Sequence, residues 1–175
     1  IEEVERQAWV RALARMLVFR LDRQGGEFMG YLENRAPEAI AFLTSRGGLN
    51  VTLGFTFAIG ARGGSAWGSR GGDYESSPLN RDDFTVLEPF QTAHVWRLPC
   101  DRIPTRDGRM PQEVRATLHL RDLPELKRAD FADDETWRLW QSALRGVRIE
   151  AAPLRLPADF SDDAGPADEE PAGGE

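Results

Sequence analysis

The clearest periodicity in the chain lies at residues 49–60, which read LNVTLGFTFAIG. Apolar residues alternate with small or polar ones through the whole stretch. Successive side chains of a β-strand point to opposite faces, so this period of two predicts a long strand with one buried face. The face expected to be buried comprises Leu49, Val51, Leu53, Phe55, Phe57 and Ile59.

Three further stretches alternate later in the chain. Phe84–Leu98 predicts a strand that is broken at Pro89, because proline cannot donate a hydrogen bond to a neighbouring strand. Val114–Leu120 and Val147–Ala151 predict two shorter strands. The residues expected to share one side of the first strand are Phe90, Thr92, His94, Trp96 and Leu98. The apolar side of the second strand is expected to comprise Val114, Ala116, Leu118 and Leu120.

The N-terminal part of the chain has a different spacing. Apolar residues recur at steps of three and four through Glu2–Gln24, which predicts a largely buried helix that ends at Gly25-Gly26. Glu27–Asn34 predicts a second helix. Pro37 suits the first turn of a third helix, which Gly47-Gly48 is expected to close.

One more helix is expected near the C-terminus. Asp133 is a residue type that caps helix N-termini, and Gly146 is expected to end this helix. Its apolar face is expected to carry Trp137, Trp140 and Leu144. The sequence therefore predicts an α+β fold, in which N-terminal helices pack on one face of an antiparallel β-sheet. The strands of this sheet are expected to be Leu49–Gly60, Phe84–Leu98, Val114–Leu120 and Val147–Leu156.

Charge divides the chain into two parts. The 175 residues include 29 acids and 22 bases, for a formal net charge of −7. The seven acids beyond Pro157, where there is no base, are Asp159, Asp162, Asp163, Asp168, Glu169, Glu170 and Glu175. Residues 1–157 are formally neutral and are expected to form one domain, with a helical part at 1–47 and a mainly β part at 48–157. Residues 158–175 are expected to be a disordered acidic tail, because they contain too little apolar surface to offset the ordering entropy.

Several protein classes are excluded by composition. Cys100 is the only cysteine, so neither an internal disulfide nor a cysteine-rich zinc site can form. The longest apolar stretch, Ala8–Leu21, contains three arginines and does not qualify as a transmembrane helix. The sequence predicts no metal and no cofactor. It favours a soluble, cytoplasmic protein, and the start at Ile1 leaves a removed targeting segment open.

An enzymatic interpretation has three candidate residues: His94, Cys100 and His119. A cysteine nucleophile would need a histidine within hydrogen-bond distance. Six residues along a strand span ~20 Å, so His94 and Cys100 meet only if the chain folds back after Pro99. The acid pairs Asp82-Asp83 and Asp133-Asp134 are better explained as helix caps or solvated turns.

A glycine-rich loop is expected at Gly60–Gly72, where two Arg-Gly-Gly triplets flank a tryptophan. Arg62, Trp67 and Arg70 on a flexible backbone could stack on nucleic-acid bases. Of the 22 basic residues 21 are arginine, but residues 1–157 have no net positive charge that would attract nucleic acid. Nucleic-acid binding is therefore an alternative that the composition does not favour.

A row of polar residues is expected on the free face of the sheet: Arg115, Thr117, His119 and Arg121. Side chains on one face of a strand follow each other at ~6.6 Å, so this row could bind a phosphate or a carboxylate. The alternative is a solvated face, whose arginines pair across strands with acids such as Glu113 or Glu150.

These observations favour a non-enzymatic binding or assembly component that acts through protein–protein contacts in a larger complex, or through self-association. The expected contact elements are the arginine and histidine face, the Trp67 loop and exposed strand edges, which can accept a partner strand. The two alternatives are an enzyme of unrecognised type and a protein that binds nucleic acid or an anion.

Overall fold

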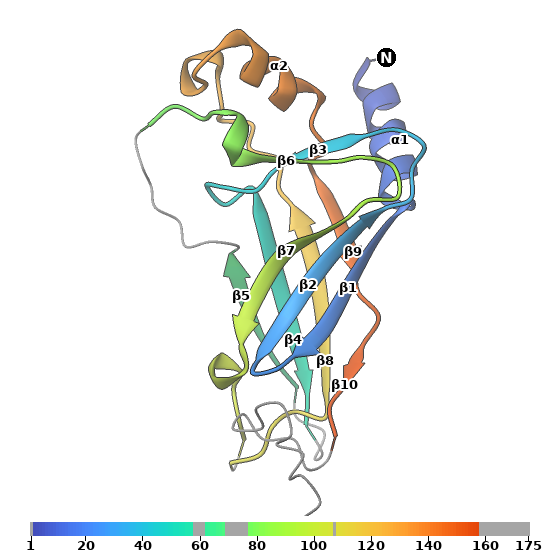
Figure 1. The fold of residues 1–175 in the computed structure, drawn as a ribbon, viewed down its shortest axis with the longest axis vertical. Coiled ribbons are helices and arrows are strands. Elements are labelled where there is room, and N and C mark those ends of the chain that lie inside the picture. Colours follow the sequence, from blue (N-terminus) through green and yellow to red (C-terminus); the bar gives the residue numbers. More distant parts are fainter. Residues whose placement is uncertain (1, 58–61, 69–76, 107, 158–175) are drawn as a thin grey trace, which may run out of the picture.

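The computed structural model describes residues 2–57, 62–68, 77–106 and 108–157 (Figure 1). The described part contains two α-helices, ten β-strands and three short 3-10 helices. In chain order these are α1 (Glu2–Ala14), β1 (Leu17–Gln24), β2 (Glu27–Asn34), β3 (Ile40–Leu43), β4 (Leu49–Thr56), β5 (Arg62–Gly68), η1 (Arg81–Asp83), β6 (Phe84–Leu87), β7 (Thr92–Pro99), η2 (Cys100–Arg102), β8 (Glu113–Leu120), η3 (Arg128–Asp130), α2 (Asp134–Ser142), β9 (Val147–Glu150) and β10 (Leu154–Arg155). The predicted α+β class is confirmed in this form, with antiparallel sheets and two helices.

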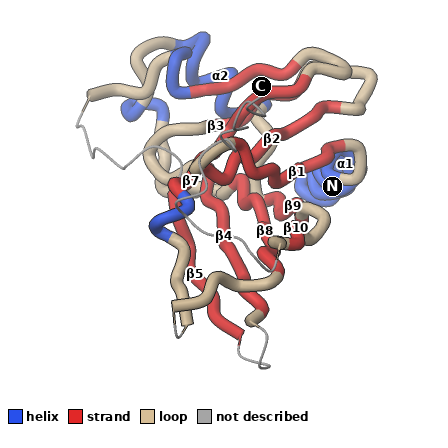
Figure 2. Tube along the Cα trace, turned by 60° about the horizontal axis from the view of Figure 1, so that its bottom comes forward, coloured by secondary structure: helices blue, strands red, loops and turns tan. Residues whose placement is uncertain are grey.

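Two antiparallel sheets form the body of the fold. A five-stranded sheet has the order β10-β8-β4-β5, and β9 also pairs with β8. A three-stranded sheet has the order β1-β2-β7. Figures 1 and 2 show the two sheets as separate layers, with α1 beside β1 and β9. Buried side chains from both sheets form one core cluster between the layers, which includes Phe19, Leu32, Leu53 and Leu118.

The alternation at residues 49–56 is confirmed. Leu49, Val51 and Leu53 are fully buried, and β4 pairs antiparallel with β8 so that Val51 lies opposite Leu118. The intervening residues of β4 lie on the other side of the sheet. The predicted strands at Val114–Leu120 and Val147–Ala151 are confirmed as β8 and β9.

The predicted N-terminal helices are wrong beyond Ala14. Residues predicted as the end of the first helix and as the second helix form the β1–β2 hairpin, paired from Leu17 opposite Asn34 to Gln24 opposite Glu27. Leu17 and Leu21 are four residues apart, a spacing that fits both a helix and a strand, and burial at every second residue of β1 shows which period applies. Gly25, with φ +59°, makes the tight turn between the strands.

Two other features of the N-terminal part differ from the prediction. Only Leu13 of α1 is buried, so the helix is mostly exposed. The segment after Pro37 forms β3, which pairs with β6, instead of a third helix. The buried side chain of Asn34 holds this segment extended: its Nδ2 donates to the carbonyl oxygens of Glu38 and Leu87, and its Oδ1 accepts from the Ala36 N–H.

Phe84–Leu98 does break near Pro89, but neither half joins the predicted sheet. β6 pairs with β3, and β7 pairs with β2. A β-bulge in β7 places Trp96 opposite Gly30 and His94 opposite Tyr31, which leaves Val95 as the extra residue. The predicted common side is therefore wrong, because Trp96 and Leu98 are buried whereas Phe90, Thr92 and His94 are exposed.

The predicted glycine-rich loop contains a strand. β5 pairs with β4 from Arg62 opposite Thr56 to Gly68 opposite Asn50, so this part of the loop prediction is wrong. Backbone pairing needs no particular side chain, and a strand rich in glycine has no alternating pattern by which it could be found. The other residues of Gly60–Gly72, and the predicted disordered tail at 158–175, lie outside the described residues.

The predicted C-terminal helix is confirmed as α2. Asp133 caps it, because its Oδ1 accepts hydrogen bonds from the Thr136 N–H and hydroxyl, both at 2.7 Å. These bonds to Thr136 also lower the pKa of Asp133. The helix ends at Ser142, before Leu144 and Gly146, and it packs with β3 and β6 around a second small core.

Candidate partner-binding face

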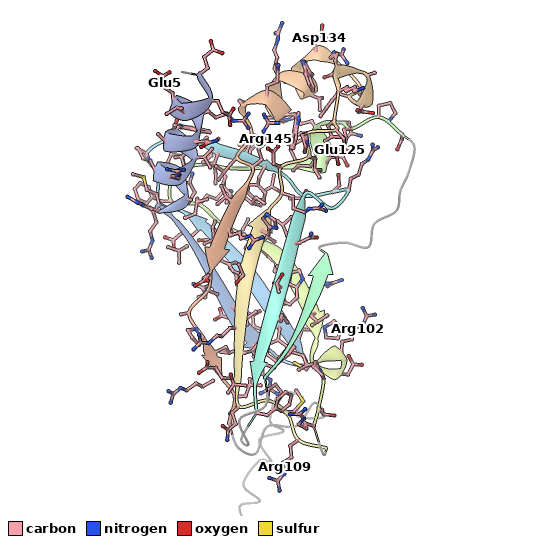
Figure 3. All side chains as sticks on the ribbon, turned by 180° about the vertical axis from the view of Figure 1, so that it is seen from behind. Glu5, Arg102, Arg109, Glu125, Asp134 and Arg145 are labelled. Carbon is pink, nitrogen blue, oxygen red and sulfur yellow. The ribbon has the colours of Figure 1, made fainter. Side chains whose placement is uncertain are left out.

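The outer face of the five-stranded sheet is the side turned away from the three-stranded sheet, and Figure 3 views the molecule from this side. Because Val114, Ala116, Leu118 and Leu120 are buried, the alternate residues of β8 must lie on this outer face. Arg115 is exposed, and Thr117 and His119 are half-buried. The predicted row on the strand therefore lies on one open sheet surface.

Residues of the neighbouring strands lie on the same outer face as the polar row of β8. His119 lies between Asn50 of β4 and Arg148 of β9, and Thr117 lies between Thr52 and Glu150. Towards the other end of β8, Arg115 lies opposite Gly54, and Glu113 lies between Thr56 and Arg155.

Three basic residues gather at one end of this outer face. We call His119, Arg121 and Arg148 the basic cluster. Arg148 is directly opposite His119, and Arg121 follows His119 by two residues, with its N–H donating to the Gly48 carbonyl oxygen at 2.8 Å. The Arg121 guanidinium also contacts the Gly47 carbonyl oxygen at 3.4 Å.

The basic cluster brings positive charges together without a nearby ion-paired carboxylate in the part of the chain that the structure describes. The pKa of His119 is lowered, first by burial and then by the charges of Arg148 and Arg121. Among the described residues, no carboxylate forms an ion pair with any of the three bases. The cluster therefore contains two arginines, Arg121 and Arg148, beside a histidine, without an ion-paired carboxylate in the described part of the chain.

Arg115 differs from the basic cluster. Its Nε lies 2.9 Å from Glu113 Oε1, so the interpretation as a solvated, paired arginine describes this residue. The sequence predicted an acidic partner across the sheet, but Glu113 belongs to the same strand as Arg115. Arg145, labelled in Figure 3, also has other contacts: it stacks over Trp140 at 4.6 Å, and its Nε lies 3.8 Å from Asp122 Oδ1.

On β4, β8, β9 and β10, the outer face has more bases than acids. Besides His119, the charged residues on the outer side of these four strands and directly after β8 are Arg115, Arg121, Arg148, Arg155, Glu113 and Glu150. These are four arginines and two glutamates, on a part of the chain that is formally neutral overall. The surplus of positive charge is therefore a property of this surface and not of the domain.

The three residues of the enzymatic alternative are not brought together. His94 lies on the outer face of the three-stranded sheet, where its ring centroid is 5.6 Å from that of Tyr31. His119 lies on the outer face of the other sheet. Cys100 is buried in the core, and burial raises the pKa of its thiol despite the lowering effect of Arg23.

The remaining candidates are scattered. Arg62 and Trp67 are in β5, opposite Thr56 and Val51, and Arg70 lies outside the described residues. Asp133 caps α2, and Asp83 completes the capping box of η1 by accepting a hydrogen bond from the Asn80 N–H, so both acid pairs have the structural role that the sequence suggested. Within residues 2–57, 62–68, 77–106 and 108–157, no group of three potential metal ligands occurs.

Sequence reasoning missed Arg148 and Asn50. The alternation at Val147–Ala151 predicts a strand, and Arg148 is one of its polar residues. The missing information was the register, which decides that β9 pairs with β8 and that Arg148 is opposite His119.

Comparisons with known proteins do not assign the chain to a family. No protein-family model matches the chain, and no curated protein matches it. Across the described residues, neither helix has the length and apolar character that crossing a bilayer requires.

Proposed function

We propose that the protein is a non-enzymatic binding component, which binds an acidic segment of a protein partner on the outer face of its five-stranded sheet. The observation that carries this proposal is the basic cluster: three adjacent bases without an ion-paired carboxylate in the described part of the chain.

A carboxylate partner would relieve the electrostatic cost of the basic cluster. Guanidinium groups bind carboxylates through two parallel hydrogen bonds, and a carboxylate near His119 would favour the protonated imidazole. Each exposed pair contributes up to about 1 kcal/mol, so affinity would come from several such contacts together.

The surface suits an extended peptide better than a nucleic acid. Glu113 and Glu150 lie on the same face and interrupt its bases, so the face lacks the continuous row of bases that contacts successive phosphates of a nucleic acid. Side chains that can donate and accept hydrogen bonds line the adjoining strand, at Asn50 and Thr52. β5 is the edge strand of this sheet among the described strands, and a partner segment could extend to it.

The test uses an oligoglutamate peptide, acetylated and amidated, and measures its affinity for the full chain by fluorescence anisotropy. The double variant Arg121→Gln with Arg148→Gln should bind about tenfold more weakly than the wild type, because two exposed ion pairs are lost. The matched control, Arg20→Gln with Arg97→Gln, removes two arginines from the outer face of the other sheet and should bind like the wild type.

Equal losses in both double variants, or unchanged binding in the cluster variant, would contradict the proposal. A single-stranded oligonucleotide of equal charge provides a second probe. If it binds the basic cluster more tightly than the peptide does, the face belongs to nucleic acid instead.

A further inference from the structure

The acidic segment 158–175 continues directly from the sheet that carries the basic cluster. It contains seven acids and no base. We propose that this segment docks in cis on the outer face of the five-stranded sheet and competes there with the acidic partner. This inference rests on the proposed function, since both occupants would use the same bases.

The point where the chain leaves the sheet favours this occupant. Arg155 of β10 lies opposite Glu113, the first residue of β8, and the Leu156 N–H donates to the Gln112 carbonyl oxygen at 2.8 Å. Segment 158–175 therefore begins beside β8, whose outer side chains form the polar row. It starts near Glu113, at the first residue of β8, whereas the basic cluster lies near the last residue of β8.

The segment is long enough to reach the cluster. Glu113 and His119 are six residues apart along β8, which corresponds to ~20 Å. Asp168, Glu169 and Glu170 are 11 to 13 residues beyond Pro157, and an extended chain of that length spans up to ~40 Å. The acids nearer to Pro157 would then lie by Arg155 and Arg115.

Charge and connectivity both favour docking in cis. The acids of the segment are opposite in charge to the surplus of arginines on the face, and covalent attachment gives a linked segment an effective concentration in the millimolar range. A weak electrostatic contact would therefore be populated without a partner. It would also be exchangeable, because exposed ion pairs are individually weak.

The main experiment compares three full-length proteins. One is the wild type, the second has the seven tail acids changed to their amides, and the third has Asp and Glu exchanged within the tail, which keeps its charge. The amide variant should bind the oligoglutamate peptide about tenfold more tightly, and the exchanged variant should bind like the wild type. The gain should disappear when Arg121→Gln and Arg148→Gln are added, and also at about 0.5 M salt.

A second readout separates docking from the general effect of net charge. The chain has two histidines, so both ring signals can be followed by NMR during a pH titration. A docked acidic segment raises the pKa of His119, and the amide variant should therefore show a lower His119 pKa than the wild type. The ring signals of His94, on the opposite outer face, should be the same in both proteins at every pH.

The possible failures can be distinguished. If the wild type and the amide variant have the same peptide affinity and the same His119 pKa, docking of the tail is wrong while the proposed function stands. If neither protein binds the peptide through the basic cluster, the proposed function itself fails. A His119 pKa that depends on protein concentration would assign the contact to the tail of a second copy and would overturn docking in cis.

Discussion

The two outer faces of the molecule are built by the same alternation but differ in how their charges are arranged. On the three-stranded sheet, Arg20 lies 2.9 Å from Asp22 and stacks over the Tyr31 ring, which also contacts His94. On the five-stranded sheet, the basic cluster has no such carboxylate among the described residues. An arginine-rich composition therefore says little about binding until the structure shows which arginines are neutralised locally.

The glycines of the two sheets show a second difference. A Cβ added at Gly30 of β2 would lie 2.9 Å from Phe19 Cε2 and 3.4 Å from Trp96 Cβ. A Cβ added at Gly54 of β4 would have no neighbour within 4 Å. Gly30 is needed for packing between the layers, whereas Gly54 leaves an open space beside Arg115 on the outer face.

The largest expected effect comes from filling these two positions with the same side chain. Gly30→Val should lower the free energy of unfolding by about 3 kcal/mol, because the added atoms overlap the Phe19 ring in a packed core. Gly54→Val should be neutral or slightly stabilising, because valine favours strands. Denaturant unfolding of both variants measures the difference, and equal losses would contradict the assignment of Gly30 to the core and Gly54 to the open face.

The next effect concerns charge on the two faces. Arg148→Glu should weaken oligoglutamate binding by more than about tenfold, since it removes one attraction and adds one repulsion. The control Arg97→Glu makes the same change on the other outer face and should leave binding within about twofold of the wild type. Anisotropy titrations at one ionic strength compare the two variants. If Arg97→Glu weakens binding as much as Arg148→Glu does, the effect reflects net charge alone and not the basic cluster.

The smallest effect is the pH dependence of stability. Because the pKa of His119 is lowered in the folded protein, the unfolded chain takes up this proton at a higher pH. The free energy of unfolding therefore falls as the pH decreases through the ordinary histidine range towards the folded pKa. His119→Gln removes this component, so the variant should lose less stability than the wild type between about pH 7 and pH 5.

Thermal or denaturant unfolding at several pH values provides the measurement, with His94→Gln as the matched variant on the other face. A His119→Gln protein whose stability falls as steeply as that of the wild type would show that neither burial nor the neighbouring arginines lower the pKa of His119 in the folded protein.

The parts of the fold that could be predicted are those where the spacing of apolar residues fits a strand but not a helix, or where a capping residue marks the start of a helix. Residues 49–56 and Val114–Leu120 alternate too strictly for a helix, and the Asp133 cap fixes the start of α2. The spacing of Leu17 and Leu21 is compatible with both periods, so sequence alone could not identify the β1–β2 hairpin.

The remaining misses come from long-range pairing. A bulge at Val95 shifts the inward side of β7, and no local pattern marks it. β5 exists because β4 supplies a complete row of backbone partners, although its own glycines do not favour a strand. Two of the three residues of the basic cluster, His119 and Arg121, were predictable from the polar row of β8, whereas Arg148 belongs to the cluster only because of the register between β8 and β9.

The most direct test of the central claim is an NMR titration of the two histidines with and without the oligoglutamate peptide. It is best made on the full chain whose tail acids are amides, so that the tail does not compete for the basic cluster. The peptide should raise the pKa of His119 and leave the ring signals of His94 unchanged, because His119 lies within the basic cluster and His94 lies on the opposite outer face. If the pKa of His119 does not change, or if the ring signals of His94 respond to the peptide as strongly as those of His119, the outer face of the five-stranded sheet is not the binding surface.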